Sequence, residues 1–447
     1  MQIDALQIKR ILQGFVAAAL LGSCASPQVL SPHGLKRQLD SALSGSAVFG
    51  RSASGFILRD AQSGITLCDF HANRLFTPAS NTKILTFHAA LSLLPDTLPT
   101  FEWLADGDTL RFRGLGDPSF LHPRFETWAK RGGDFLARSP LALALCSSPI
   151  PLPRYGPAWA WDDYPYTYQC ERGILPLYGH LARVSPGTER GSETQVWPTF
   201  FKDQFTPDLS LAARAPKRDE LRNRWRYHPD SAWHNHQTPF LSDGLTTALL
   251  ADTLKRSVTL SGSCPDSPGW RQFSACPKDT LLRLMMYESD NFIAEQLLIA
   301  AAFSRYGTPD EAQLIRYLRD TLWAARSNRP RWADGSGLSR YNLISPRYLS
   351  EALLDLWREM PRDSLLRFFP AGGRQGTIAE RYSGPENAPF VWAKTGSMSG
   401  VCCLSGYIRT KRGKFLVFSF MHNNFTGPST PWKDEMERLL RWIYFHY

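Results

Sequence analysis

The chain has 447 residues, of which 43% are hydrophobic and 21% charged; this composition is that of an ordinary globular protein with more than one core. The formal net charge of +10 favours a polyanionic neighbour, such as a cell wall or acidic lipid headgroups. After the first thirty residues, no stretch reaches about 18 uninterrupted apolar residues, so we exclude a later membrane span and expect the remainder to be soluble.

The N-terminal thirty residues predict export from the cytoplasm. Lys9 and Arg10 precede the apolar stretch 11–21, and small residues follow, as in a secretory signal. Leu21-Gly22-Ser23-Cys24 is also similar to a bacterial lipoprotein box, in which Cys24 would become the lipidated N-terminus; simple cleavage near Ala25 is the alternative. We therefore expect an extracytoplasmic or periplasmic protein, held on a membrane if Cys24 is lipidated, with no nucleic-acid partner.

Residue patterns predict a mixture of strands and helices along the chain. Residues 56–60 and 66–70 indicate a β-hairpin, which leads into a buried helix over 84–91. From Leu94 to Cys276, short strands, prolines and aromatic clusters indicate an inserted β-rich region. Helical periodicity then returns, followed by strand patterns. We expect these helices over 280–303, 310–325 and 345–359, and these strands over 391–394, 402–409 and 414–422.

The cysteines number seven once Cys24 is set aside, so in an oxidising compartment at least one thiol stays free. Cys264 and Cys276 flank a loop that contains Pro and Gly, and they are the best candidates for a disulfide, although connectivity does not follow from sequence. No spacing of cysteines or histidines suggests zinc, and we expect neither a metal nor a cofactor.

The segment Pro78-Ala79-Ser80-Asn81-Thr82-Lys83 carries the first catalytic signal. Three positions separate Ser80 from Lys83, so on a helix both side chains lie on one face, with an amine beside a hydroxyl. That pair can act as a nucleophile with its base, and unpaired N–H groups of the first turn can hold an oxyanion. The alternative is that Ser-x-x-Lys arises by chance and Ser80 only caps the helix.

Two further motifs make chance an unlikely explanation. Ser289-Asp290-Asn291 leads into a helix, and Lys394-Thr395-Gly396-Ser397 follows a strand. Together with Ser80-x-x-Lys83, they form the signature of penicillin-binding proteins and class A β-lactamases. Acyl transfer needs a base for the serine, a proton path to the leaving amine, and donors for the oxyanion.

Each motif residue has a chemical role to fill. Lys83 is the base if burial and the nearby Lys394 lower its pKa. Ser289 can relay the proton, and Asn291 can hold the substrate amide. Lys394 and Thr395 offer a charge and a hydroxyl to a substrate carboxylate. The backbone N–H groups of Ser80 and Ser397 would form the oxyanion hole.

A domain-sized stretch separates Ser80 from Ser289, whereas a short helical segment joins these elements in a class A β-lactamase. The sequence resembles instead the class C low-molecular-mass penicillin-binding proteins, the D-alanyl-D-alanine carboxypeptidase/endopeptidase family. The resemblance is carried by the three motifs with their flanks and by Gly114-Leu115-Gly116-Asp117-Pro118, Trp161-Asp162-Asp163, Asp334-Gly335-Ser336-Gly337-Leu338-Ser339-Arg340 and Gly376-Thr377.

The resemblance implies an α/β (α+β) fold, in which a transpeptidase/β-lactamase-like domain with an antiparallel sheet and helices is split by an inserted β-rich region. We expect the catalytic domain over 28–95 and 277–447, the inserted part over 96–276, and the signal over 1–24. Between about Val184 and Gln237 the chain departs from the family pattern, so a reduced or rearranged third domain is possible there.

The resemblance also implies an activity. Members of the family form an acyl-enzyme, here on Ser80, and cut D-Ala-D-Ala or the D-Ala-to-diaminopimelate cross-link of peptidoglycan; stem peptides, cross-links and β-lactam antibiotics are the expected partners. An arginine at the Arg340 position receives the charged end of diaminopimelate with an acid and an aromatic residue from the insertion. The expected acid is Asp163, or Asp162 if the alignment with the family shifts by one residue, and the expected aromatic residue is Tyr168.

Two other functions remain open at this point. A serine β-lactamase would need fast hydrolysis of the acyl-enzyme, and a cell-wall-binding protein would have kept the fold without turnover. The intact motifs argue against the second. The alternative explanation for the specificity residues is that Asp163 caps a turn and Arg340 makes an internal salt bridge.

Overall fold

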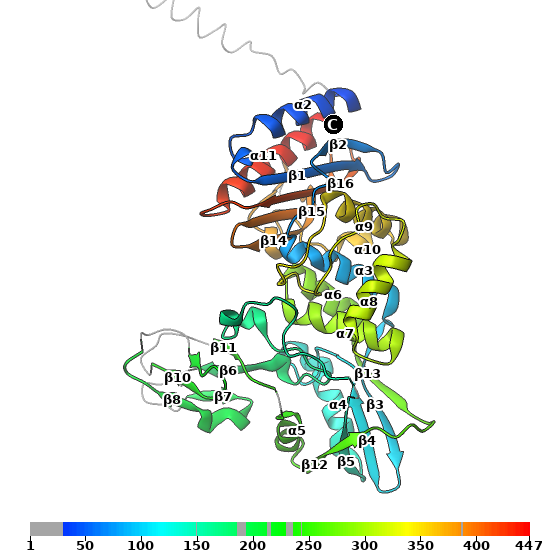
Figure 1. Ribbon diagram of the computed structural model, residues 1–447, viewed down its shortest axis with the longest axis vertical. Helices are drawn as coiled ribbons and strands as arrows, with labels where there is room; N and C mark the ends of the chain where they lie inside the picture. Colours follow the sequence, from blue (N-terminus) through cyan, green and yellow to red (C-terminus); the bar gives the residue numbers. More distant parts are fainter. Residues whose placement is uncertain are drawn as a thin grey trace, which may run out of the picture.

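The computed structural model describes residues 30–447, except 149, 186–193, 212–215, 229–235, 243 and 386–387. Cys24 and the predicted signal therefore lie outside the described residues. The molecule is elongated, with one large sheet near each end and a helical layer between them (Figure 1). Within the described part of the chain, no helix is both long enough and apolar enough to cross a membrane.

The first sheet joins the two ends of the chain. Its five antiparallel strands have the order β14-β15-β16-β1-β2. Because β1 pairs with β16, Phe56 lies opposite Phe420, and the predicted hairpin is confirmed as β1 and β2. The strands are β1 (Ala53–Asp60), β2 (Thr66–Phe70), β14 (Val391–Met398), β15 (Val401–Arg409) and β16 (Phe415–Asn423).

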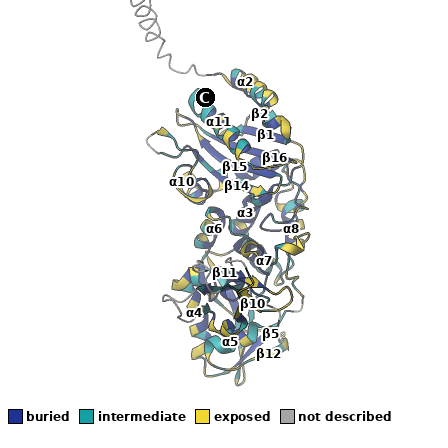
Figure 2. Cartoon of the chain, turned by 90° about the vertical axis from the view of Figure 1, so that its left-hand side faces the viewer, coloured by how far each residue is buried: buried dark blue, intermediate teal, exposed yellow. Residues whose placement is uncertain are grey.

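Both faces of this sheet are buried, so its central strands are dark blue in Figure 2. Phe418 and Phe420 of β16 pack under α2 (Pro32–Gly45) and α11 (Thr430–His446), whereas Val417 and Met421 face α3 (Lys83–Leu93) and α9 (Pro346–Glu359). Successive side chains of a strand point to opposite faces, which explains the unbroken apolar run in β16. The sequence patterns did not reveal α2 and α11.

The helical layer differs from the prediction at one functional position. The helix expected over 280–303 is in fact two helices, α6 (Lys278–Tyr287) and α7 (Asn291–Tyr306). Ser289 lies between them with φ of 59°, and the Asp290 side chain accepts a hydrogen bond from the backbone N–H of Ile293. The left-handed residue and this N-cap start a new helix. The remaining helices here are α8 (Glu311–Tyr317) and α10 (Arg362–Leu366).

The second large sheet has the order β12-β5-β4-β3-β13, and two three-stranded sheets accompany it, β8-β10-β9 and β11-β6-β7. The five strands are β3 (Thr97–Asp106), β4 (Thr109–Gly114), β5 (Ala142–Ser147), β12 (Val258–Ser263) and β13 (Arg271–Pro277). The six shorter strands are β6 (Leu181–Ser185), β7 (Gln195–Trp197), β8 (Phe205–Pro207), β9 (Lys217–Arg218), β10 (Trp225–Tyr227) and β11 (His236–Pro239).

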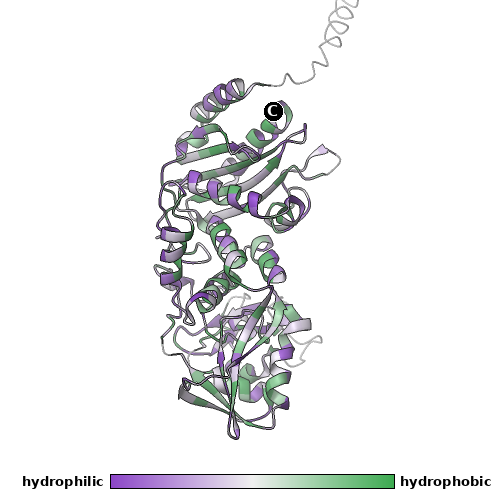
Figure 3. Cartoon of the chain, turned by 90° about the vertical axis from the view of Figure 1, so that its right-hand side faces the viewer, coloured by the Kyte–Doolittle hydropathy of each residue, from purple (hydrophilic) through white to green (hydrophobic). Residues whose placement is uncertain are grey.

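Two helices, α4 (Glu126–Arg138) and α5 (Thr246–Leu254), pack beside these strands. Many helices of the molecule show both hydrophilic and hydrophobic segments, as expected when one face is buried (Figure 3). The pattern of residues 242–255 predicts a helix, which α5 confirms. The patterns missed α4, whose Gly132-Gly133 pair is unfavourable in a helix. A Cβ on Gly132 would lie 2.8 Å from the Phe120 ring, so close packing accounts for the glycine.

The predicted disulfide between Cys264 and Cys276 is wrong. Cys264 follows β12, and Cys276 lies on β13, at the opposite edge of the five-stranded sheet. Strands about 4.8 Å apart separate those edges by roughly 19 Å, whereas a disulfide needs Cα atoms within about 7 Å. The thiol of Cys264 instead contacts Cys146, and the seven cysteines among the described residues are free thiols.

Candidate active site

Ser80 lies in the 3₁₀ turn η2 (Ala79–Thr82), directly before α3. Lys83 is the first residue of α3 and is completely buried. Its Nζ lies 3.0 Å from Ser80 Oγ, 2.6 Å from Asn291 Oδ1 and 2.7 Å from the Ser336 carbonyl oxygen. The structure therefore brings the predicted nucleophile and base together, with an amide from the second motif beside them.

Burial dominates the electrostatics of Lys83 and lowers its pKa to about 8. Three carboxylates oppose this shift, in the order Asp334, Asp290 and Glu295. The expected effect of burial is thus present, whereas the sequence patterns did not reveal the opposing carboxylates. A lysine with this pKa has a sizeable neutral fraction near pH 8 and can take a proton from a hydroxyl.

Lys394 lies beneath the site rather than in solvent. Its Nζ donates to Ser289 Oγ at 2.8 Å and to the Thr395 carbonyl oxygen at 2.9 Å, and the side chain is completely buried. Burial, and then Lys83, hold the pKa of Lys394 well below its usual value. That Lys394, with Thr395, offers its charge to a substrate carboxylate stays a prediction; the structure adds that its amine is hydrogen-bonded to Ser289 and to its own strand.

A cavity of about 600 Å³ opens on one side of Ser80, lined by Ser289, Thr395 and Ser397 among others. Thr377, on the 3₁₀ turn η9 (Gly376–Ile378), also lines it, and its Oγ1 lies 2.9 Å from Thr395 Oγ1. No role for Thr377 followed from the sequence. The sequence feature that could have indicated a role is the Gly376-Thr377 pair, which contributes to the family resemblance.

Two glycines allow the chain to close tightly around Ser80. A Cβ on Gly396 would lie 2.3 Å from the Pro78 carbonyl oxygen, so only glycine lets β14 approach the serine turn. Gly337 has φ of 87°, and a Cβ there would lie 2.0 Å from the Ala79 carbonyl oxygen. Strand β14 and the loop 334–340 are therefore both pressed against η2.

A second cavity of about 630 Å³ also has Ser80 in its lining, together with Asp163, Tyr168 and Arg340. Tyr168 Oη donates to Asp163 Oδ1 at 2.7 Å, and Asn291 Nδ2 donates to the Tyr168 carbonyl oxygen at 2.9 Å. Arg340 donates to the Ser399 carbonyl oxygen at 3.3 Å, and the described residues include no salt bridge to it. Asp162, the alternative acid, lines the same cavity.

Most of the chain matches one known protein family. Residues 35–176 and 242–443 match the D-Ala-D-Ala carboxypeptidase 3 (S13) family, which is well over half of the sequence. The chain belongs to this family. The unmatched stretch between the two segments contains the region from Val184 to Gln237, where the sequence departs from the family pattern. Ser80, Lys83, Ser289 and Lys394 all lie within the matched residues.

Individual relatives agree with the family. D-alanyl-D-alanine carboxypeptidase DacB of Haemophilus influenzae is 26% identical, covering 83% of this chain and 86% of the relative. Penicillin-sensitive carboxypeptidase A of Dictyostelium discoideum is 28% identical, covering 83% of each. Penicillin binding protein 4 of H. influenzae superposes with a TM-score of 0.71 at 21% identity, covering 91% of this chain and 99% of that one. Its structure has also been solved with a β-lactam.

These comparisons confirm the predicted fold class and the predicted family. The S13 enzyme is a serine-type D-Ala-D-Ala carboxypeptidase, a hydrolase of the low-molecular-mass penicillin-binding class. Among the described residues, no group of three or more histidine, cysteine or acidic side chains is placed to hold a metal ion.

Proposed function

We propose that Ser80 is the nucleophile and Lys83 its general base. Neutral Lys83 takes the Ser80 hydroxyl proton as Oγ bonds to the carbonyl carbon of the penultimate D-Ala. The bond from that carbon to the leaving amine then breaks, and water later hydrolyses the acyl-enzyme. The observation that carries this proposal is the 3.0 Å contact between a completely buried lysine and a serine at the junction of two cavities.

The neighbouring motif residues have supporting roles in this proposal. Ser289 Oγ passes a proton to the leaving nitrogen, since its hydroxyl is held by Lys394 Nζ at 2.8 Å. Asn291 keeps Lys83 in place and faces the substrate amide. Thr395, with Ser397, lines the side on which the terminal carboxylate would lie. The backbone N–H groups of Ser80 and Ser397 bind the oxyanion.

The two cavities favour action on both free ends and cross-links of peptidoglycan. Ser80 lines both, so each cavity offers space for part of a substrate chain bound at this serine. We therefore propose carboxypeptidase activity together with DD-endopeptidase activity. Labelling with a fluorescent penicillin tests the mechanism: a stable adduct supports the peptidase, rapid turnover a β-lactamase, and the absence of an adduct a cell-wall-binding protein. Purified cross-linked and uncross-linked muropeptides separate the two peptidase activities.

We also propose that Arg340 and Asp163 recognise the end of the diaminopimelate side chain. This end carries one ammonium and one carboxylate, so Asp163 can pair with the former and Arg340 with the latter. Tyr168 supports this arrangement because its hydroxyl holds Asp163. Within the described part of the chain, the exposed guanidinium of Arg340 makes one polar contact, at 3.3 Å with a backbone carbonyl, which leaves donors for a ligand.

Replacing Arg340 by alanine should therefore lower kcat/KM for diaminopimelate-containing peptides by about tenfold or more, since a charge-assisted hydrogen bond is worth roughly 1.5–3 kcal/mol. Hydrolysis of a small ester should stay nearly unchanged. Arg331→Ala is a matched control, because that arginine stacks on Tyr341 at 4.4 Å and does not line the cavity. Equal losses on both substrates would place the specificity pocket elsewhere.

The proposal extends to domains and location. We propose that 28–95 and 277–447 form the catalytic domain, that 96–276 is inserted, and that the enzyme works outside the cytoplasm, in the periplasm where there is one. Residues 1–24 would act as a signal with a lipobox. The basic charge suits contact with peptidoglycan or acidic headgroups.

Cys24 is expected to carry a lipid in the native protein, because the sequence before it is similar to a lipobox. Mass spectrometry of the N-terminal peptide from a bacterial membrane fraction should find an acylated Cys24, and Cys24→Ala should release the enzyme from that fraction. An unmodified N-terminus beyond Cys24 would contradict this expectation.

A further inference from the structure

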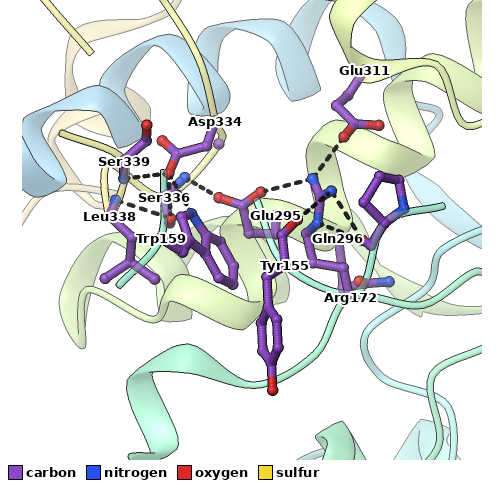
Figure 4. Close-up of polar contacts among 12 residues, drawn as sticks. Tyr155, Trp159, Arg172, Glu295, Gln296, Glu311, Asp334, Ser336, Leu338 and Ser339 are labelled. Atoms are coloured by element: carbon purple, nitrogen blue, oxygen red, sulfur yellow. Dashed lines mark hydrogen bonds and ion pairs between the residues drawn. The ribbon is translucent and has the colours of Figure 1, made fainter. Parts of the chain in front are cut away.

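A buried polar cluster lies where helix α7, the loop 334–340 and the inserted region meet (Figure 4). At its centre is Glu295 of α7, which is only 1% exposed. None of the steps proposed above uses this carboxylate. A buried acid must be held by hydrogen bonds or charges, so its partners indicate what it does.

The first partner is the loop. Glu295 Oε1 accepts a hydrogen bond from the Ser336 backbone N–H at 2.7 Å, and the Ser336 carbonyl oxygen lies 2.7 Å from Lys83 Nζ. A single residue therefore connects the carboxylate to the catalytic amine. Ser336 is completely buried, and the following glycine presses against the Ser80 turn, so the loop has little room to move.

Asp334 holds the same loop from the other side. Its carboxylate accepts from the backbone N–H groups of Gly337 at 2.9 Å and Ser339 at 2.6 Å. It also accepts from Nε1 of Trp159, a residue of the inserted region, at 2.9 Å. The two acids thus hold neighbouring parts of one loop, and only Glu295 binds the N–H of the residue whose carbonyl contacts Lys83.

The second partner of Glu295 comes from the inserted region. Arg172 is buried, with Nη1 3.6 Å from Glu295 Oε2 and 2.6 Å from Glu311 Oε1, and it also donates to the carbonyl oxygens of Pro153 and Tyr155. No described residue donates a hydrogen bond to Glu295 Oε2, so the ion pair with Arg172 is what balances it. Glu295 is therefore held on both sides.

We propose that Glu295 is a positioning residue for Lys83: it holds the Ser336 carbonyl against the catalytic amine, and Arg172 of the inserted region anchors it there.

Charge gives this arrangement a second, measurable effect. Lys83 faces three carboxylates, Asp334, Asp290 and Glu295, and it lies near the buried Lys394. Burial and Asp334 raise the pKa of Glu295 to about 7, and Arg172 opposes that shift. Near pH 8 Glu295 is therefore mostly ionised and raises the pKa of Lys83. Removing its charge must lower the pKa of Lys83, so the active neutral amine forms at lower pH.

Two variants separate position from charge. Glu295→Gln keeps an oxygen for the Ser336 N–H but loses the charge, whereas Glu295→Ala loses both. Asp117→Asn is the matched control: Asp117 is another buried carboxylate with a raised pKa, held by Thr100 and Ser119 away from Lys83. The readout is the second-order rate constant for acylation of the full chain by a fluorescent penicillin, measured from pH 5.5 to 9.5, with thermal unfolding in parallel.

For the wild type we expect the rate to rise with pH through an acid limb near pH 8. Glu295→Gln should keep the plateau rate within about threefold and move the limb to lower pH by about half a unit. Glu295→Ala should lower the plateau about tenfold or more. Asp117→Asn should leave the limb and the plateau unchanged.

The proposal is overturned if Glu295→Ala acylates at the wild-type plateau rate, or if Glu295→Gln leaves the limb in place while both Glu295 variants lose rate only in proportion to their folded fraction. The inference rests on the proposed role of Lys83. If Lys83→Arg acylates normally, that role fails; if Lys83 is required but the Glu295 variants behave as the wild type, only the present inference fails.

Discussion

Ser80→Ala is expected to abolish the penicillin adduct and to lower peptide hydrolysis by about four orders of magnitude or more, because no other hydroxyl takes the place of the nucleophile. The side chain is only half-buried, and its hydroxyl accepts a hydrogen bond from Lys83 Nζ. Alanine also fits a 3₁₀ turn, so we expect the melting temperature to change little. Labelling of the purified variant, followed by intact-mass analysis, measures the effect.

A second serine near the same helix serves as the control. Ser92 of α3 donates to the His88 carbonyl oxygen at 2.9 Å, away from both cavities, so Ser92→Ala should label at the wild-type rate. A folded Ser80→Ala enzyme that still labels normally would show that another residue is acylated.

Lys83→Arg is expected to slow acylation by about a thousandfold or more. The base must lose its proton, and a guanidinium keeps its proton in proteins, whereas burial brings the pKa of Lys83 to about 8. The larger head also has to fit among Ser80 Oγ, Asn291 Oδ1 and the Ser336 carbonyl oxygen. Stopped-flow acylation with a chromogenic β-lactam measures the loss.

Packing and chemistry can be separated with two further variants. Lys83→Met has nearly the length of lysine without an amine and should be as slow as Lys83→Arg. Lys278→Arg changes another buried lysine, which donates to the Leu94 carbonyl oxygen at 2.7 Å, and should acylate normally. Acylation of Lys83→Arg at the wild-type rate would rule out general-base catalysis by this residue.

The sequence by itself determined the reaction and most of the secondary structure near the site. Ser80-x-x-Lys83 and the other two motifs depend on short spacings, which a helix turn or a strand end converts directly into shared faces. The hairpin of β1 and β2 and the strands β14 to β16 follow from short apolar runs bounded by turn residues. The break in the family match, between residues 176 and 242, includes the stretch from Val184 to Gln237 in which the sequence departs from the family pattern.

Only the tertiary structure decided where the charges lie. The motif pattern does not reveal that Lys394 is completely buried against Ser289, or that Thr377 lies beside Thr395, because partners far apart in sequence create these environments. Helix α4 was missed for the same reason, since packing against Phe120 offsets the low helix propensity of Gly132.

Cys264 and Glu295 show the same limit. Cys264 and Cys276 are close in sequence, but the strand order places them at opposite edges of a sheet. In the sequence, Glu295 is an ordinary residue of an apolar helix. Its contacts with Ser336 and Arg172 form because the fold brings two segments that are distant in sequence against α7. Local sequence patterns identify the nucleophile. Burial and long-range partners set the protonation of its base, because desolvation and neighbouring charges depend on the whole fold.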